Sequence, residues 1–196
     1  MNTPQRFSSL ESALCSLFGE GTKIEGTRSI SGGDINEAYG LMLTGGKCIF
    51  MKTNTKKNLS FFTAEALGLT AIARTQAIGT PHILGMGTDE GRGGYSFLLL
   101  EFISGKSRSR NYWEDFARRL AAMHRASTAG LVSGGKYGFD CDNYIGRHDQ
   151  INTGHDSWTS FFRDCRLEPQ FQDAAFYFDR EDQKRIIRFL DHIPSP

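Results

Sequence analysis

The sequence predicts an α+β fold: a small lobe of five antiparallel strands with one main helix, followed by the first helices of an α-helical large lobe. Two observations predict it. Short runs of β-branched and aromatic residues, separated by glycine-containing turns, fill residues 23–54 and 83–102. From residue 108 onward, apolar residues recur at helical spacing instead. We therefore divide the chain into a small lobe at 1–102, a linker or hinge at 103–107 and the start of a helical lobe at 108–196.

The elements of the small lobe follow from local patterns. Leu10, Leu14 and Leu17 share one helical face, which predicts a short amphipathic helix over residues 9–18. Three strands with glycine-containing turns follow within 23–54 as an antiparallel meander. Residues 61–77 form the main helix, and Pro81 blocks its continuation. Strands at 83–87 and 95–102 complete the lobe.

Amphipathic helices dominate the rest of the chain. Apolar stripes predict helices at residues 113–125, 156–166 and 181–192. The rest of the large lobe should bury each of these stripes, because a large exposed apolar patch marks a partner site or an aggregation liability. We therefore expect this chain alone to be marginally folded, to self-associate, or to bind a complementing C-terminal polypeptide.

Composition excludes several classes of protein. Twenty-three Lys and Arg residues against 22 Asp and Glu residues leave a net charge of +1, which argues against a nucleic-acid binder. The longest apolar run, 97–100, is far shorter than a membrane span, and the N-terminus has no signal-peptide pattern. We expect a cytoplasmic protein with neither nucleic acid nor membrane as a partner. The four cysteines are expected to be reduced structural thiols, because their wide separation does not suit a metal site or a disulfide scaffold.

Three features of the small lobe belong together. Ser31-Gly32-Gly33-Asp34 lies between two strands, where glycines let backbone N–H groups approach phosphate oxygens. Lys52 interrupts an apolar strand, and Glu65 follows thirteen residues later in the main helix. Singly, the glycine turn and Lys52 have ordinary structural explanations, as a hairpin turn and a solvated lysine, whereas the apolar neighbours of Glu65 indicate a carboxylate that needs a cationic partner. In this order they are typical of the small lobe of protein kinases and predict a nucleotide cleft.

Several segments, in order from about residue 30 to 170, carry a more specific resemblance. They are Ser31-Gly32-Gly33-Asp34-Ile35-Asn36-Glu37-Ala38-Tyr39, Phe50-Met51-Lys52-Thr53-Asn54, Phe62-Thr63-Ala64-Glu65-Ala66, Phe97-Leu98-Leu99-Leu100-Glu101, Leu120-Ala121-Ala122-Met123-His124, Tyr137-Gly138-Phe139-Asp140, Trp158-Thr159-Ser160-Phe161-Phe162 and Arg163-Asp164-Cys165-Arg166-Leu167-Glu168-Pro169-Gln170. Together they resemble the fructosamine kinase (ketosamine-3-kinase, protein-ribulosamine 3-kinase) family.

The resemblance implies a protein-kinase-like fold and a deglycation repair reaction. ATP, with Mg²⁺, would phosphorylate the sugar 3-hydroxyl of a fructosamine or ribulosamine on a glycated lysine or protein, or of a small ketosamine. By position, Gly32, Gly33 and Asp34 would form the phosphate loop, and Lys52 would bind phosphate while paired with Glu65. Some eukaryotic members carry a redox-active cysteine where this chain has Asp34, so no such switch is expected.

The resemblance also implies the site of the adenine ring. Glu101, Phe102, Ile103 and Ser104 would form the hinge. As in other kinases, the carbonyl of Glu101 and the amide of Ile103 would make the hydrogen bonds to adenine.

The family's catalytic loop, His-Gly-Asp-Leu-Trp-x-x-Asn, and its later Asp-Pro segment do not occur in the 196 residues. We expect no catalytic or metal-binding residue in this chain, magnesium ligands in a missing C-terminal region, and no activity of the chain alone. His148-Asp149 and His155-Asp156 lack the required spacing and are expected to be solvated loop residues, and His124 to be structural. Two alternatives stay open: a catalytically dead nucleotide- or ligand-binding module, and a small-molecule kinase acting on aminoglycoside- or choline-type alcohols.

Overall fold

The computed structural model describes residues 4–32, 35–91 and 93–193. The chain forms two compact units, residues 1–126 and 127–196. The α+β class predicted from the sequence is confirmed, with the sheet confined to the first unit apart from one small hairpin.

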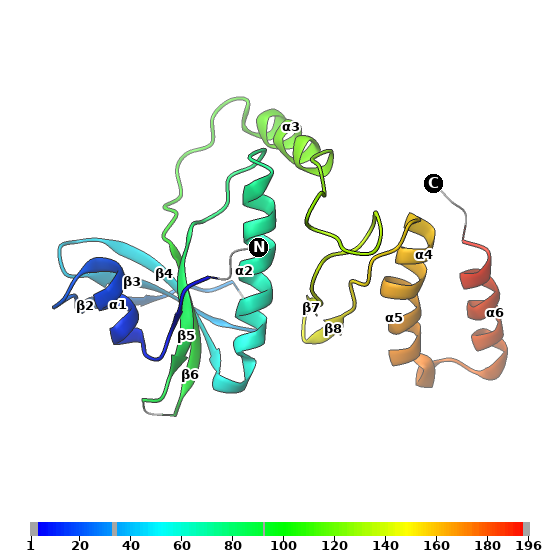
Figure 1. Cartoon of the computed structure of the whole chain (residues 1–196), viewed down its shortest axis with the longest axis horizontal. Helices are drawn as coiled ribbons and strands as arrows, with labels where there is room; N and C mark the ends of the chain where they lie inside the picture. Colours follow the sequence, from blue (N-terminus) through cyan, green and yellow to red (C-terminus); the bar gives the residue numbers. More distant parts are fainter. Residues whose placement is uncertain (1–3, 33–34, 92, 194–196) are drawn as a thin grey trace. The chain divides into compact units, whose positions relative to one another are not determined.

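A six-stranded mixed sheet is the centre of the first unit (Figure 1). Its strands lie in the order β1-β5-β6-β4-β3-β2. Strands β2 to β6 form the antiparallel part, as predicted, whereas β1 pairs parallel to β5. The bounds are β1 (Arg6–Phe7), β2 (Ile24–Ser29), β3 (Glu37–Leu43), β4 (Cys48–Thr55), β5 (Ile83–Asp89) and β6 (Tyr95–Glu101).

The prediction of a five-stranded antiparallel sheet was therefore wrong, because the sheet has a sixth strand, β1, which lies at its edge and is parallel to its neighbour. Strand β1 can approach β5 because Gly85 and Gly87 have no side chains. A Cβ at Gly87 would lie 2.0 Å from the carbonyl oxygen of Phe7, and one at Gly85 would lie 2.5 Å from the Phe7 ring. Because these two glycines have no Cβ, the backbone of β1 can lie close to β5, which is a common reason for glycine inside a strand.

Two helices cover the two faces of the sheet (Figure 1). Helix α1 (Leu10–Phe18) begins with a capping box at Ser9 and packs its leucines with the side chains of β3, β4 and β6. Helix α2 (Leu59–Arg74) follows the short 3₁₀ turn η1 (Lys56–Asn58) and buries Phe62 and Ala66 on the opposite face. The predicted helices at 9–18 and 61–77 are thus confirmed, the second beginning two residues earlier and ending three residues earlier.

Helix α3 (Tyr112–His124) ends the first unit and confirms the helix predicted at 113–125. It has no buried residue, and Trp113 remains 62% exposed. His124 is exposed at its last turn.

The second unit combines a small hairpin with a chain of helices. The elements are β7 (Asn143–Ile145), β8 (His148–Gln150), α4 (Trp158–Phe162), the π-helical turn η2 (Arg163–Leu167), α5 (Glu168–Asp173), the 3₁₀ turn η3 (Ala175–Tyr177) and α6 (Arg180–Asp191). The helix predicted at 156–166 begins at Trp158 and extends through η2 into α5, and the helix predicted at 181–192 is α6. The hairpin was not predicted.

A polar network holds this second unit together. Arg166 donates hydrogen bonds to the carbonyls of Ile151 and Cys165 (2.7 Å each) and to Oδ1 of the buried Asn152 (2.6 Å). Burial lowers the pKa of the Arg166 guanidinium from its usual value. None of the helices in the described ranges is long and apolar enough to cross a membrane.

Candidate functional site

Lys52 and Glu65 form the charged centre of the candidate site. Strand β4 alternates between the two sheet faces, which places Phe50 and Lys52 on the face that α2 covers. Lys52 Nζ donates a hydrogen bond to Glu65 Oε1 over 2.6 Å. The two side chains keep 28% and 27% of their surface exposed, so the pair lies at the border of the interior rather than within it.

The glycine-containing loop lies beside this pair. Ile30, Ser31, Gly32, Ile35, Asn36, Ala38, Phe50 and Lys52 line a hollow of about 330 Å³. Gly32 has φ +134°, a conformation that side chains rarely adopt, and within the described part of the chain no residue other than its neighbours in sequence comes within 4 Å of the place where its Cβ would be. Gly33 and Asp34, the other predicted members of the phosphate loop, lie outside the described residues. The hollow therefore combines one ammonium group with apolar walls and an open stretch of backbone.

A second hollow, of about 460 Å³, adjoins the first. Both are lined by Ile30, Ser31 and Phe50. The second is also lined by three of the four predicted hinge residues, namely Phe102, Ile103 and Ser104. Phe102 packs closely on β3, where a Cβ at Gly40 would lie 3.1 Å from its ring.

Glu101, the fourth predicted hinge residue, directs its side chain elsewhere. Its backbone amide donates to the carbonyl of His82 (2.8 Å), and its Oε2 accepts from the backbone amide of His82 (3.2 Å). The structure thus brings Lys52 and Gly32 to one hollow, with Glu65 paired to Lys52, and places residues 102–104 at the adjoining one. The roles of these residues in binding stay predictions.

The structure adds wall residues that the sequence reasoning missed. Ile30, Ala38 and Phe50 supply the apolar walls. Phe50 could have been found, because it lies two residues before Lys52 and so on the same face of the same strand. Ile30 and Ala38 face each other across the hairpin, where the amide of Ile30 donates to the carbonyl of Ala38 over 2.8 Å. No local pattern marked these two residues.

The histidines of the second unit depart from the prediction. His148 begins strand β8 instead of lying in a loop, although its side chain is exposed. His155 is only 20% exposed, and its Nε2 lies 3.6 Å from Sγ of the buried Cys165. Its backbone also pairs with Tyr137. The expectation of a solvated loop residue was therefore wrong for His155, which packs inside the second unit.

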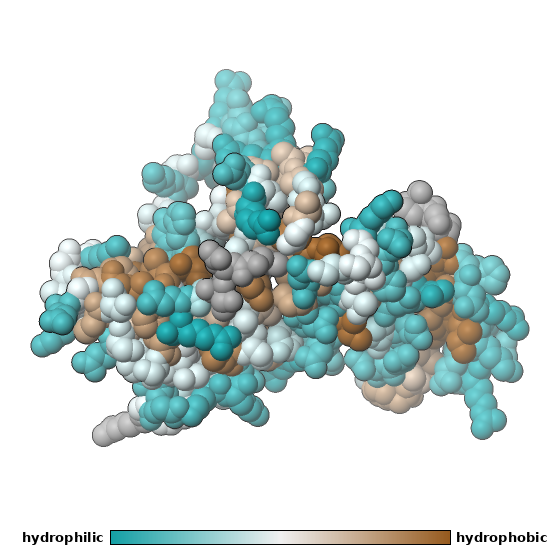
Figure 2. Space-filling view, in the orientation of Figure 1, coloured by the Kyte–Doolittle hydropathy of each residue, from teal (hydrophilic) through white to brown (hydrophobic). Residues whose placement is uncertain are grey.

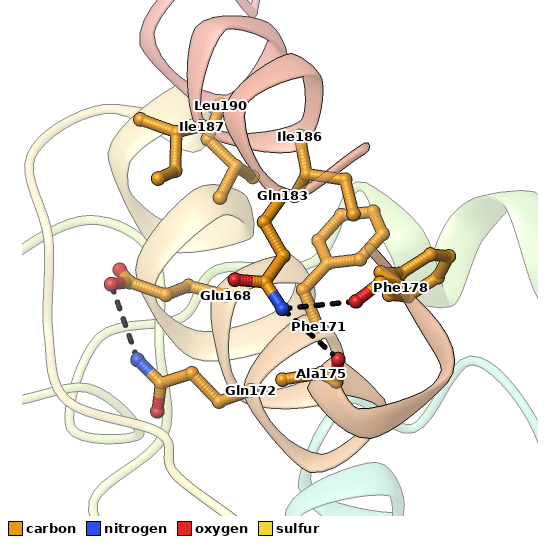
Figure 3. A pocket seen from close by; sticks show the side chains of 9 residues that line it. All are labelled: Glu168, Phe171, Gln172, Ala175, Phe178, Gln183, Ile186, Ile187 and Leu190. Carbon is orange, nitrogen blue, oxygen red and sulfur yellow. Dashed lines mark hydrogen bonds between the residues drawn. The ribbon is translucent and has the colours of Figure 1, made fainter. Parts of the chain in front are cut away.

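Another hollow, of about 260 Å³, lies between α5, η3 and α6 (Figure 3). Its walls are mostly apolar, with Phe171, Ile186 and Leu190 among them. Gln183 donates from Nε2 to the carbonyls of Ala175 (3.2 Å) and Phe178 (3.1 Å), so its amide is used within the unit. In the space-filling view, apolar side chains lie in a seam between polar ones over α5 and α6 (Figure 2). Without a cationic lining residue or a glycine loop, this hollow does not suit a phosphorylated ligand.

Metal binding has no counterpart among the described residues, which contain no group of three or more His, Cys, Asp or Glu side chains able to hold an ion. The Lys52 ammonium lines the first hollow and offers a positive charge for an anion. Lys52 suits phosphate oxygens, and Phe50, Phe102 and Ile103 in the adjoining hollow suit a flat ring.

Comparison with known proteins agrees with this description. The fructosamine kinase family profile matches residues 7–193. A Synechocystis protein named as a probable ketoamine kinase is 34% identical over 167 residues, covering 85% of this chain and 54% of its own length. A chloroplastic protein-ribulosamine 3-kinase of Oryza sativa subsp. japonica is 39% identical over 166 residues, covering 81% and 46%.

A solved structure shows the same fold. The crystal structure from Haemophilus somnus described as a fructosamine-3-kinase superposes with a TM-score of 0.75 at 28% identity, covering 96% of this chain and 63% of that one. The chain thus spans about half the length of the curated relatives that it matches.

Proposed function

Because the chain belongs to the fructosamine kinase family, we propose that residues 1–126 bind ATP for the phosphorylation of a ketosamine. The observation that carries the proposal is the Lys52–Glu65 pair at 2.6 Å, with Lys52 lining the hollow that the glycine-containing loop borders. A lysine held by a helix glutamate is the arrangement with which kinases bind nucleotide phosphates.

Each end of the nucleotide has residues of matching chemistry. Lys52 would neutralise phosphate oxygens, and the backbone at Gly32 would come close to them because no side chain intervenes. Phe50, Phe102 and Ile103 would cover the adenine ring in the adjoining hollow. In its bound state ATP supplies the phosphoryl group, and Glu65 keeps the Lys52 ammonium in place.

The proposed acceptor is a ketosamine, a class supported by the names of the relatives. The γ-phosphoryl group would pass to the oxygen of the sugar 3-hydroxyl, which loses its proton, and ADP would leave. Magnesium belongs to the proposal as the partner of ATP, but the described residues offer no cluster for it, and we assign none of them to it. The cytoplasmic location expected from the sequence is likewise part of the proposal.

Binding is tested by isothermal titration of ATP into this chain and into the variant Lys52→Met. We expect the variant to lose at least about tenfold in affinity, since a charge-assisted contact to phosphate is removed. Glu65→Gln, which keeps the shape and removes the charge, should lose less. Lys57→Met is the matched control, because Lys57 is an exposed lysine in η1, the turn that connects β4 to α2. Equal affinity of Lys52→Met and the unaltered chain would refute the assignment.

The acceptor is tested separately, by ADP release with fructosyl-lysine, ribulosyl-lysine, choline and an aminoglycoside. The assay uses this chain and the longest gene product that contains it. Release with the two glycated lysines alone supports the ketosamine proposal. Release with choline or the aminoglycoside alone supports a small-molecule alcohol kinase. ATP binding without release for any acceptor in either protein supports a binding module.

A further inference from the structure

The side chain of Asn54 links three elements around the candidate phosphate site. Asn54 lies on β4 two residues beyond Lys52, on the same face of the sheet. Its backbone is fixed in register opposite Ser96. The fully buried Ser96 hydroxyl contacts the carbonyls of Asn54 (3.3 Å) and Thr55 (3.0 Å). A rigid strand end therefore carries this side chain.

The amide of Asn54 is saturated with hydrogen bonds. Its Nδ2 donates to the carbonyl of Ile35 (3.3 Å) and to Oδ1 of Asn36 (2.6 Å), both in the segment that leads from the glycine-containing loop into β3. Its Oδ1 accepts from the backbone amide of Thr55 (2.7 Å) and from Nδ2 of Asn58 (2.9 Å). Because the Thr55 amide can only donate, Oδ1 must face it, and Nδ2 must face the loop segment.

Asn58 is the N-cap residue of α2. Asparagine at an N-cap usually accepts a hydrogen bond from the first turn of its own helix. The side chain of Asn58 makes no such bond and binds Asn54 instead. Helix α2 also carries Glu65, so the chain Asn36–Asn54–Asn58 connects the loop segment to the helix that holds Lys52 in place.

We infer that Asn54 is a positioning residue that holds Ile35 and Asn36 against β4, so that this wall of the hollow beside Lys52 is already in place when the phosphates of the nucleotide bind. This inference rests on the proposed ATP binding. A wall segment that is already held in place loses less conformational entropy when the ligand binds. Ile35 and Asn36, to which Asn54 donates, line the hollow beside Lys52 but not the adjoining hollow. The gain in affinity should therefore be confined to ligands that carry phosphates.

The first test needs no ligand. Hydrogen exchange of the whole chain is compared between the unaltered protein, Asn54→Ala, Asn54→Asp and the control Asn111→Ala, an exposed asparagine whose side chain makes no cap hydrogen bond. Asn54→Asp keeps the acceptor for Thr55 and Asn58 but removes both donor bonds to the loop segment. We expect peptides covering residues 35–38 to exchange at least about tenfold faster in both Asn54 variants, with residues 59–74 unchanged in Asn54→Asp. Unchanged exchange at 35–38 overturns the inference.

The second test separates positioning from general stability. Affinities for ATP and for adenosine are measured by titration for the unaltered chain, Asn36→Ala, Asn54→Ala and the double variant. We expect Asn54→Ala to lose about tenfold for ATP and less than twofold for adenosine. The double variant should bind ATP no more weakly than Asn54→Ala does, because the two substitutions remove the same hydrogen bond between Asn54 and Asn36.

The outcomes distinguish this inference from the proposed function. An equal loss for ATP and adenosine, or additive losses in the double variant, overturns the positioning role of Asn54 while ATP binding stands. If the unaltered chain binds neither ligand, the proposed function fails and this inference fails with it, although accelerated exchange at 35–38 would still show the structural link.

Discussion

Lys52 and Glu65 are close, but water still reaches both side chains, which are 28% and 27% exposed. Ion pairs accessible to solvent contribute only about 0–1 kcal/mol to folding stability. The Lys52→Met variant should therefore keep the fold, and its loss of ATP affinity should report the missing ammonium group rather than unfolding. The short 2.6 Å distance matters more for where the ammonium lies than for the stability of the unit.

The cysteines give a prediction about single side chains. Cys165 is buried, whereas Cys48 is exposed. Burial raises the pKa of the Cys165 thiol above its usual value; Arg166 lowers this pKa by a smaller amount, and Asp164 raises it further. Since the thiolate is the reactive form, iodoacetamide at pH 8 should modify Cys48 at least about tenfold faster than Cys165, as measured by peptide mass spectrometry. In urea the two rates should converge, and equal rates in the native protein would contradict this prediction.

The same shift determines the sign of a pH effect on stability. The unfolded chain ionises this thiol at a lower pH than the folded chain does. The contribution of Cys165 is therefore complete below about pH 8.5 and is lost as the pH rises toward its raised folded value. Cys165→Ala should reduce the alkaline loss of stability of residues 127–196.

The Lys52–Glu65 pair could be predicted from the sequence, because strand alternation and helix position are local properties. The period of two in β4 points to Lys52, and Glu65 follows from its place in the next helix. The link from Asn54 to Asn36 could not be predicted, since it depends on the path of the loop between two strands. His155 was misjudged for a similar reason: its polar neighbours in sequence are not its neighbours in space, which include Phe161 and Cys165.

Among the elements, β1 depends on glycines whose role the sequence does not mark. Gly85 and Gly87 lie inside β5, where glycine usually weakens a strand, yet here they admit the backbone and ring of Phe7. Two residues are too few to show an alternating pattern, so β1 has no signal of its own. The hairpin β7–β8 was missed likewise, because its strands have three residues each and are rich in polar side chains.

A pair of alanine substitutions tests this account of β1. Gly87→Ala would bring a Cβ to 2.0 Å from the Phe7 carbonyl oxygen, so the strand must move away. We expect a loss of about 2 kcal/mol or more in the free energy of unfolding, as for other overpacked sites. Gly68→Ala in α2 is the control, because, apart from its chain neighbours and the nearby backbone of its own helix, none of the described residues has an atom within 4 Å of its Cβ position. It should stabilise by about 0.5–1 kcal/mol, the gain expected for alanine over glycine in a helix. Urea denaturation measures both, and a Gly87→Ala variant as stable as the unaltered chain would show that β1 is dispensable.

Across the whole molecule, burial is distributed unevenly between the two units. All but two of the buried apolar side chains among the described residues lie in residues 1–126, the exceptions being Phe161 and Cys165. Residues 127–196 combine this smaller apolar burial with aromatic contacts and with polar contacts such as those of Arg166 and Asn152. Exposed apolar side chains remain on η3 and α6, Phe176 at 77% and Phe189 at 54% among them. The self-association expected from the sequence stays a prediction that these side chains support.

This uneven distribution predicts two unfolding transitions. Apolar burial is the main favourable contribution to folding, so residues 127–196 should unfold at lower urea than residues 1–126. The chain has two tryptophans, one in each unit, and Trp113→Phe leaves Trp158 as the reporter of the second. In this variant, Trp158 fluorescence should change at lower urea than the far-ultraviolet circular dichroism of the main transition.

ATP should then act on one transition only. A ligand that binds the folded state at a hundred times its Kd stabilises that state by about 2.7 kcal/mol. Because the candidate site lies wholly in residues 1–126, ATP should move the later transition to higher urea and leave the Trp158 transition in place. Adenosine should produce a smaller shift of the same transition, since it lacks the phosphates that Lys52 is proposed to bind. A single transition followed by both probes and moved as a whole by ATP would show that the two units fold as one cooperative body, and that the weakly buried second unit draws its stability from the first.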